Sequence, residues 1–342
     1  MKKRLLALLL VGILSAVSCT ACAEIAYQKF NHYFFGTFDT IITLTAYAES
    51  KEDFSVYAEL AQAEIERYHE IFDRYNSYDG VNNLFAVNAA AGKGPVKAEP
   101  ELIDLLLLVR QWHEQYGTAV NPAMGSVLMH WHNARTEGTY VPEEEALKAA
   151  SLHTNFNDVL IDEEAQTIAF ADPELSIDLG AVAKGYAAQL TADTLRKAGL
   201  TSFLVNAGGN VVCGGPPLDG RSWWTIGIED LDGVSTRLMI GAVNLSIVTS
   251  GDYQRFYEVD GKRYHHLIDP ETLYPATHMR AVSILHPDSG FADFLSTTAF
   301  LLPYEQSRAL IESIPEAEAL WTLYDGTELY TDGFAERIAL VN

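Results

Sequence analysis

Residues 176–189 read Ser-Ile-Asp-Leu-Gly-Ala-Val-Ala-Lys-Gly-Tyr-Ala-Ala-Gln, which predicts a short apolar strand that runs directly into a helix ending near Ala198. Gly180 lets the main chain turn sharply, and the first N–H groups of a helix have no partner inside it. Lys184 adds a cation where an anion would lie. The glycine orders of a P-loop and of a dinucleotide fingerprint are both missing. The stretch therefore predicts either a phosphate-binding turn or a plain packing turn between strand and helix.

The start of the chain predicts export and lipid anchoring. Two lysines and an arginine precede an apolar run at 5–17, which is too short to be a committed membrane span. The run ends in small residues before a cysteine, which resembles the bacterial lipobox, whose cysteine is acylated. We expect a lipoprotein signal peptide at 1–18, lipidation at Cys19 or, as second choice, Cys22, and a location on the extracytoplasmic face of the bacterial cell membrane. An ordinary signal peptide cut near Ala23 is the alternative.

The charge balance limits the possible partners. The chain has 46 acidic and 23 basic residues, a formal net charge of −23. This argues against nucleic acid and against binding an anionic membrane through a basic patch. A phosphate site must therefore be built locally, from Lys184, helix ends or a metal. Only three cysteines occur, so no disulfide framework is indicated. Because no repeat or linker interrupts the chain, we expect residues 19–342 to form a single domain.

Helices and short strands follow one another along the chain. In 53–75 and 102–116, apolar residues recur at steps of three and four, which predicts two amphipathic helices. Residues 249–253 are polar and predict a turn. After a short N-terminal tether, the predicted strands are 40–45, 159–161, 167–170, 203–206, 223–229, 320–323, 328–330 and 338–341, and the remaining helices are 142–150, one that starts at 291, and 304–314.

Two histidines occupy a predicted hairpin whose turn is Asp260-Gly261. Side chains alternate along a strand, so His265 and His266 point to opposite faces and only one can look into a cleft. A histidine there could remove a hydroxyl proton, because its pKa lies near working pH. A pair of surface histidines is the alternative.

Two further segments are candidate ligand sites. Gly208 and Gly209 follow a predicted strand and permit close approach of a ligand, with a tight hairpin as the alternative. Asp293 and Thr297 lie one helical turn apart on the same face. A carboxylate and a hydroxyl, completed by a carbonyl, phosphate and water, suit Mg²⁺. The alternative is an ordinary helix start with a buried threonine.

Four motifs occur in the order found in the ApbE family of flavin transferases, which move FMN from FAD onto a protein threonine, and the chain resembles this family from Gly36 to Thr298. The motifs are Asp-Leu-Gly-Ala-x-Ala-Lys-Gly at 178–185, Val-Asn-x-Gly-Gly-Asn at 205–210, Thr-Ser-Gly-Asp-Tyr at 249–253 followed by His-Leu-Ile-Asp-Pro at 266–270, and Asp-x-x-Ser-Thr at 293–297. The resemblance implies an α+β fold with a T-fold-like core, in which antiparallel β-sheets are flanked by helices.

The resemblance also implies roles for single residues. It makes His266 the catalytic base and places Mg²⁺ on Asp293, Thr297 and a main-chain oxygen of Ala181. Residues 84–88 match a family loop that borders the flavin. The implied FAD contacts are Phe35, Asn88, Ala119, Val120, Asn121, Asp178, Lys184, Gly208, Gly209 and Leu267. The chain departs from the family at Asn121, which replaces an acid and cannot supply its charge, and at Leu273, which replaces a glycine.

The implied reaction is Mg²⁺-dependent attack of a threonine hydroxyl on the FMN phosphorus of FAD, with release of AMP. The acceptor would be an exported or membrane redox protein. Two alternatives remain. One is an FAD pyrophosphatase, which delivers the same phosphorus to water and needs the same site. The other is a lipoprotein that holds FAD without turning it over.

Overall fold

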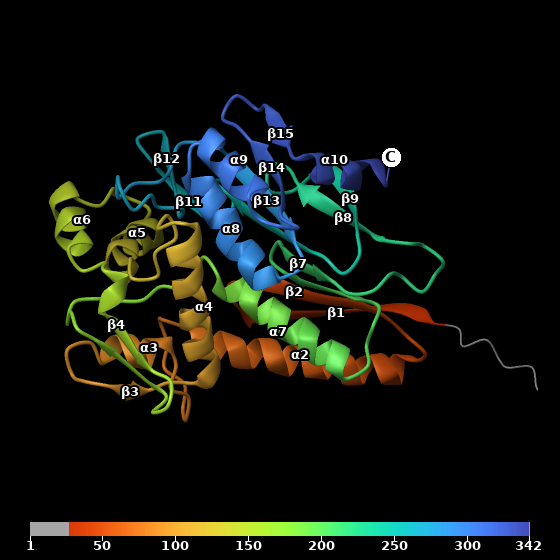
Figure 1. Ribbon diagram of the computed structural model, residues 1–342, viewed down its shortest axis with the longest axis horizontal. Coiled ribbons are helices and arrows are strands. Elements are labelled where there is room, and N and C mark those ends of the chain that lie inside the picture. Colours follow the sequence, from red (N-terminus) through yellow and green to blue (C-terminus); the bar gives the residue numbers. More distant parts are fainter. Residues whose placement is uncertain (1–26, 342) are drawn as a thin grey trace, which may run out of the picture.

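The computed structural model describes residues 27–341 (Figure 1). The predicted signal peptide and the predicted lipidation at Cys19 or Cys22 lie outside the described residues. Within 27–341, no helix is long and apolar enough to cross a membrane.

One antiparallel sheet of eight strands organises the molecule, in the order β1-β2-β6-β7-β10-β13-β14-β15. Most of the helices lie in the connection between the neighbouring strands β2 and β6. Chain segments from both ends of the sequence thus meet in one sheet. The strands are β1 Gln28–Thr37, β2 Thr40–Ala48, β6 Phe203–Ala207, β7 Asn210–Cys213, β10 Ser246–Gly251, β13 Ala281–His286, β14 Glu318–Thr322 and β15 Glu328–Tyr330.

Three helices cover one face of this sheet and lie side by side in Figure 1: α2 (Lys51–Phe72), α7 (Ala183–Lys197) and α8 (Ser289–Leu301). Helix α2 begins where the Ser50 hydroxyl accepts the N–H of Asp53, which satisfies one of the unpaired donors of the first turn. Its apolar stripe joins Ile42 and Leu44 of β2 in the main core. Every residue of α8 is buried, because neighbours surround it on all sides.

A two-stranded sheet covers part of the other face. Strands β8 (Trp224–Glu229) and β9 (Thr236–Ala242) pack a second apolar core against β7, β10, β13 and β14. Phe334 of α10 (Asp332–Ala339) closes this core. The molecule therefore has a helical layer, a central sheet and a smaller β layer, which confirms the α+β fold with antiparallel sheets flanked by helices.

The remaining elements gather at one end of the molecule (Figure 1). A third apolar cluster joins α5 and α6 to the hairpin of β11 and β12. The elements are α3 Leu84–Ala89, α4 Pro100–Tyr116, α5 Gly125–Glu137, α6 Glu144–Ser151, the 3₁₀ turn Phe156–Asp158, β3 Val96–Lys97, β4 Val159–Asp162, β5 Thr167–Phe170, β11 Phe256–Val259 and β12 Lys262–His265. Helix α9 (Tyr304–Glu312) packs with α8 and β14.

Several predicted elements differ in the structure. The strand expected before Gly180 is only an isolated bridge between Ser176 and Met124, since the Ile177 N–H donates to a side chain instead of a neighbouring strand. The strand predicted at 338–341 is wrong, because Phe334 and Ile338, four residues apart, place one face of helix α10 on the second core.

Three segments proved more regular than predicted. Residues 249–251 belong to strand β10 and not to a turn, because their main chain pairs with β13. The family-like loop at 84–88 is helix α3, which the Asn83 side chain caps by accepting the N–H of Ala86. The expected N-terminal tether gives way at Gln28 to β1, which pairs with β2 along most of its length.

Candidate active site

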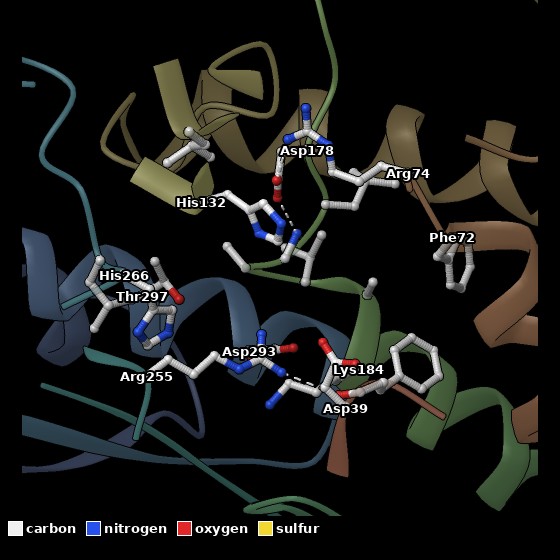
Figure 2. A pocket seen from close by; sticks show the side chains of 18 of the residues that line it. Asp39, Phe72, Arg74, His132, Asp178, Lys184, Arg255, His266, Asp293 and Thr297 are labelled. Atoms are coloured by element: carbon white, nitrogen blue, oxygen red, sulfur yellow. Dashed lines mark hydrogen bonds and ion pairs between the residues drawn. The ribbon is translucent and has the colours of Figure 1, made fainter. Parts of the chain in front are cut away.

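A cavity of about 560 Å³ lies where the 178–184 turn, α5, the 249–255 segment and α8 meet. In Figure 2, Asp178, Arg74 and His132 lie on one side of it, and His266, Thr297, Arg255, Asp293 and Lys184 lie on the other. The volume is within the range of cavities that bind small molecules.

Asp178 and Arg74 build the wall on the first side. The two side chains form an ion pair, and a second Asp178 oxygen accepts the Gly180 N–H at 2.7 Å. Burial alone would raise the pKa of Asp178, but Arg74 and the Gly180 N–H outweigh burial and hold the pKa below its usual value. Arg74 also donates to the carbonyl of Gly125 and the hydroxyl of Ser176. Asp178 is therefore a fixed anion that shapes the turn.

Asn88 and Asn121 bond to the main chain of segments that border the cavity. The Asn88 amide donates to the carbonyl of Ile177 and accepts its N–H, at 2.9 and 2.8 Å. Asn88 does not line the cavity, whereas Asn121 does. Asn121 accepts the N–H of Ala123 and donates to the carbonyl of Thr154. Both side-chain amides therefore fix the main chain near the cavity by hydrogen bonds.

The other side of the cavity contains the predicted metal ligands. Asp293, Thr297 and Ala181 all line it, as does Lys184. The Asp293 carboxylate accepts the Gly185 N–H at 2.8 Å, which ties the start of α7 to α8. Burial raises the pKa of Asp293 to about 6, although Lys184 opposes this rise.

These residues fit Mg²⁺. The available ligands are oxygens: a carboxylate, a hydroxyl and the main chain of the turn. The buried Asp293 carboxylate has only partial compensation from its own surroundings, as its raised pKa shows, so a cation beside it would be stabilised. Across residues 27–341, no three His, Cys, Asp or Glu side chains group into a metal site. Such a site would need substrate oxygens and water, which is how Mg²⁺ is commonly held.

The two adjacent histidines take different positions. His265 is buried away from the cavity, with its ring nitrogens bonded to the carbonyl of Ala276 and the N–H of Leu267. His266 lines the cavity, and its Nδ1 is buried without a hydrogen-bond partner among residues 27–341. Burial lowers the pKa of His266 well below its ordinary value, and the nearby Arg255 adds to this effect. His266 is therefore a neutral imidazole at neutral pH.

Besides Arg74, sequence reasoning missed other cationic or ionisable residues of the cavity, among them Arg135, Arg255 and His132. Arg135 on α5 has its pKa lowered by burial and by Arg255. Neither arginine forms an ion pair in the part of the chain that the structure describes, and Arg255 donates only to the carbonyl of Phe38. Arg255 follows the 249–253 motif by two residues and could have been chosen from it. No sequence signal marks Arg135.

Of the other predicted FAD contacts, some line this cavity and some lie outside it. Ala119, Val120 and Leu267 line the cavity, but Phe35 does not and is 67% exposed. Gly208 and Gly209 line a second, neighbouring cavity. Leu273 has a φ of +64°, a left-handed conformation that glycine adopts without strain.

The fold and this cavity define an α+β enzyme whose site combines a buried carboxylate, a neutral histidine and cations that form no ion pair within residues 27–341. Residues 38–321 match the model of the ApbE family, so the chain belongs to that family. A protein of Treponema pallidum (strain Nichols) named FAD:protein FMN transferase is 36% identical over 274 residues, which cover 76% of this chain and 75% of that protein. A protein of the same name from Klebsiella pneumoniae (strain 342) is 30% identical over 263 residues, 75% of this chain and 80% of its own.

Solved structures agree in fold. The crystal structure of the ApbE protein from Thermotoga maritima has a TM-score of 0.80 at 28% identity and covers 91% of this chain and 99% of that one. The flavin transferase ApbE from Vibrio cholerae has a TM-score of 0.77 at 24% identity, over 91% of this chain and 100% of its own. With these relatives, the chain is an enzyme of the transferase class.

Proposed function

We propose that this protein is an FAD:protein FMN transferase, which moves FMN from FAD to a threonine hydroxyl of an exported or membrane redox protein. The threonine oxygen forms a bond to the FMN phosphorus, the bond from that phosphorus to the bridging oxygen breaks, and AMP leaves. The observation that carries the proposal is the placement of the neutral His266 in one cavity with Asp293, Thr297 and Lys184.

His266 would act as the general base. A neutral imidazole can accept the threonine proton, whereas a protonated one cannot. Its Nδ1 makes no hydrogen bond within the described residues, so the ring is not committed to a structural contact as His265 is. General-base assistance of this kind is worth about 10²–10⁴ in rate.

Asp293, Thr297 and the main chain at Ala181 would hold Mg²⁺ together with substrate oxygens and water. The metal would supply positive charge to the diphosphate and to the leaving phosphate. Lys184, Arg135 and Arg255 add fixed cations around the same space. Their charge overcomes, over a short range, the repulsion that a chain of net charge −23 exerts on FAD.

The N-terminal pattern supports a lipid anchor at Cys19, or at Cys22, on the extracytoplasmic face of the membrane. This location would bring the enzyme to acceptors that are themselves exported or in the membrane.

The test is incubation of the purified enzyme with FAD, Mg²⁺ and the exported and membrane protein fraction of a flavin-starved bacterial host. We expect an in-gel fluorescent band that survives denaturation, together with free AMP, and neither with His266→Ala. Free FMN and AMP without a labelled protein would identify a pyrophosphatase instead. FAD bound and left intact would identify an FAD-holding protein.

A further inference from the structure

A second cavity of about 600 Å³ adjoins the active-site cavity. We propose that it is the groove in which the acceptor polypeptide docks as an extended strand, an inference that rests on the transferase function proposed above. Several residues line both cavities, so a polypeptide in the second cavity would lie directly beside the first and could direct a side chain toward it. The shared residues are Asp39, Lys184, Thr249, Gln254 and Arg255.

One side of the groove is the edge of strand β8. Four consecutive residues, 226–229, line the groove. Side chains alternate between the two faces of a strand, so four in a row can border one space only along the strand's edge. Strand β8 pairs with β9 and with no other strand of residues 27–341. An edge of this kind leaves N–H and C=O groups free to pair with an incoming extended chain.

The opposite side is the uncovered part of the central sheet. Ile42 and Leu44 of β2 point into the helical core, so Ile41 and Thr43 point to the other face, where they line the groove. Ile41 is 53% exposed, and Tyr33, which lies opposite Thr43 in the β1–β2 register, is 58% exposed. Large apolar side chains exposed together indicate an interaction surface.

The turn between β6 and β7 borders the groove, since Gly208 and Gly209 both line it. Gly208 has a φ of +59°, and a Cβ there would lie 2.2 Å from the Thr40 hydroxyl oxygen. A residue with a side chain would be strained in this left-handed conformation, and its Cβ would also clash with Thr40. The glycine lets the turn lie directly on β2, beside the shared wall.

The occupant follows from the continuity of the two cavities. A protein acceptor must bring a hydroxyl to His266 from outside, while FAD fills the first cavity. At the shared wall, Lys184 and Arg255 face both spaces, so phosphate on one side and a hydroxyl-bearing main chain on the other can meet there. A free strand edge recognises main chain, and this suits an extended segment around a threonine.

The test uses synthetic peptides of about ten residues, the length of a long strand. An array of single-threonine peptides, taken from the exported proteins of one bacterial genome, is first treated with wild-type enzyme, FAD and Mg²⁺, and peptides that gain flavin fluorescence become the probes. The variants are Ile41→Arg and Thr43→Arg, which add bulk and charge inside the groove alone. Val56→Arg is the matched control, because Val56 is 65% exposed on α2, in the helical layer.

We expect each groove variant to raise the peptide KM by about tenfold or more, the loss typical of a central interface residue. FAD affinity, measured by flavin fluorescence, should stay within about twofold, and Val56→Arg should change neither quantity. Using two variants guards against misfolding of one.

Four results would contradict the proposal that the acceptor docks in this groove. An unchanged peptide KM in both folded variants would show that the acceptor binds elsewhere. A matching loss of FAD affinity would show that the second cavity holds part of FAD. If whole exported proteins are labelled but no peptide is, the transferase function stands and recognition of an extended segment fails. If neither is labelled, the transferase function itself fails, and the groove fails with it.

Discussion

Helices α7 and α8 approach each other closely at Gly185, and its replacement by alanine tests both the packing and the site. A Cβ at this position would lie 2.3 Å from the Ser289 carbonyl oxygen and 2.5 Å from Cβ of Asp293. Neither neighbour is the end of a flexible chain, so the two helices must move apart by roughly 1 Å, since real contacts of this type need more than 3 Å. The Gly185 N–H that holds the Asp293 carboxylate would move with them.

The structure sets the size of the effect. Overpacking of a well-packed core costs about 1–3 kcal/mol. At about 2–4 °C per kcal/mol for a large domain, the melting temperature of Gly185→Ala should fall by between about 2 and 12 °C. A catalytic group displaced by about 1 Å can lose about 10²-fold in rate. Transfer of FMN should therefore fall far more than the modest loss of stability would explain.

The matched control is Gly290→Ala on the facing helix. The nearest atoms to its added Cβ are 3.3 Å away, so they need to yield by only a few tenths of an ångström. We expect a melting temperature and a transfer rate close to wild type, measured by calorimetry and by in-gel flavin fluorescence. If Gly185→Ala behaves like Gly290→Ala, the close approach of α7 to α8 is not what positions Asp293.

Other changes test the remaining parts of the site. Asp293→Asn removes the carboxylate charge, so transfer at limiting Mg²⁺ should fall by about 10²-fold and recover in part at raised Mg²⁺; full activity in a Mg²⁺ titration would rule out a metal there. His266→Ala should lower kcat by about 10²–10⁴ with FAD affinity retained, while His265→Ala should mainly lower the melting temperature, and equal losses of kcat would mean that the base is misassigned. Burial keeps the folded pKa of His266 well below 6.5, so the base stays neutral and kcat/KM should hold level from pH 8 to about 6.5. At lower pH the rate should fall as His266 and the Asp293 carboxylate, whose pKa burial raises to about 6, take up protons, whereas a decline centred above 6.5 would contradict the neutral base. A double Cys19→Ser and Cys22→Ser variant should leave the membrane fraction on centrifugation, and unchanged partitioning would disprove the lipid anchor.

The sequence predicted those helices and strands whose structure depends mainly on the residues within the segment itself. Helix α2 shows its core face as a regular stripe. The helix predicted to start at 291 is α8, which begins slightly earlier, at Ser289, because the Asp288 side chain caps it by accepting the N–H of Phe291. The choice between His265 and His266 came from the resemblance to the family, because strand alternation alone says that the two differ and not which faces inward. The structure then gives His265 two structural hydrogen bonds and leaves His266 on the cavity.

Tertiary contacts decided the elements that the sequence did not predict. Ile177 and its neighbours Leu175 and Leu179 suit a strand, but the side chain of Asn88 and the carbonyl of Pro122 accept the N–H groups of Ile177 and Asp178. Both partners are distant in sequence, and no local pattern reveals them. Residues 338–341 are likewise β-prone in isolation, yet the second core places Phe334 and Ile338 on one helical face. In both segments, contacts with residues distant in sequence override the local preference for a strand.

The cations of the active site were also hard to predict from the sequence, because tertiary structure brings them together. The net charge of −23 implies that a phosphate site needs local positive charge, and sequence reasoning found Lys184 alone. Arg74 and Arg135 come from a loop after α2 and from α5, and they meet the cavity only because the chain folds back twice. Arg74 forms an ion pair with Asp178, so its charge is already neutralised and it supports the turn. Arg135 and Arg255 form no ion pair within the described range, and the partial burial of two such cations beside one cavity costs free energy unless an anion joins them. That cost is the physical reason to expect the FAD diphosphate on this side of the cavity, beside Lys184 and Asp293.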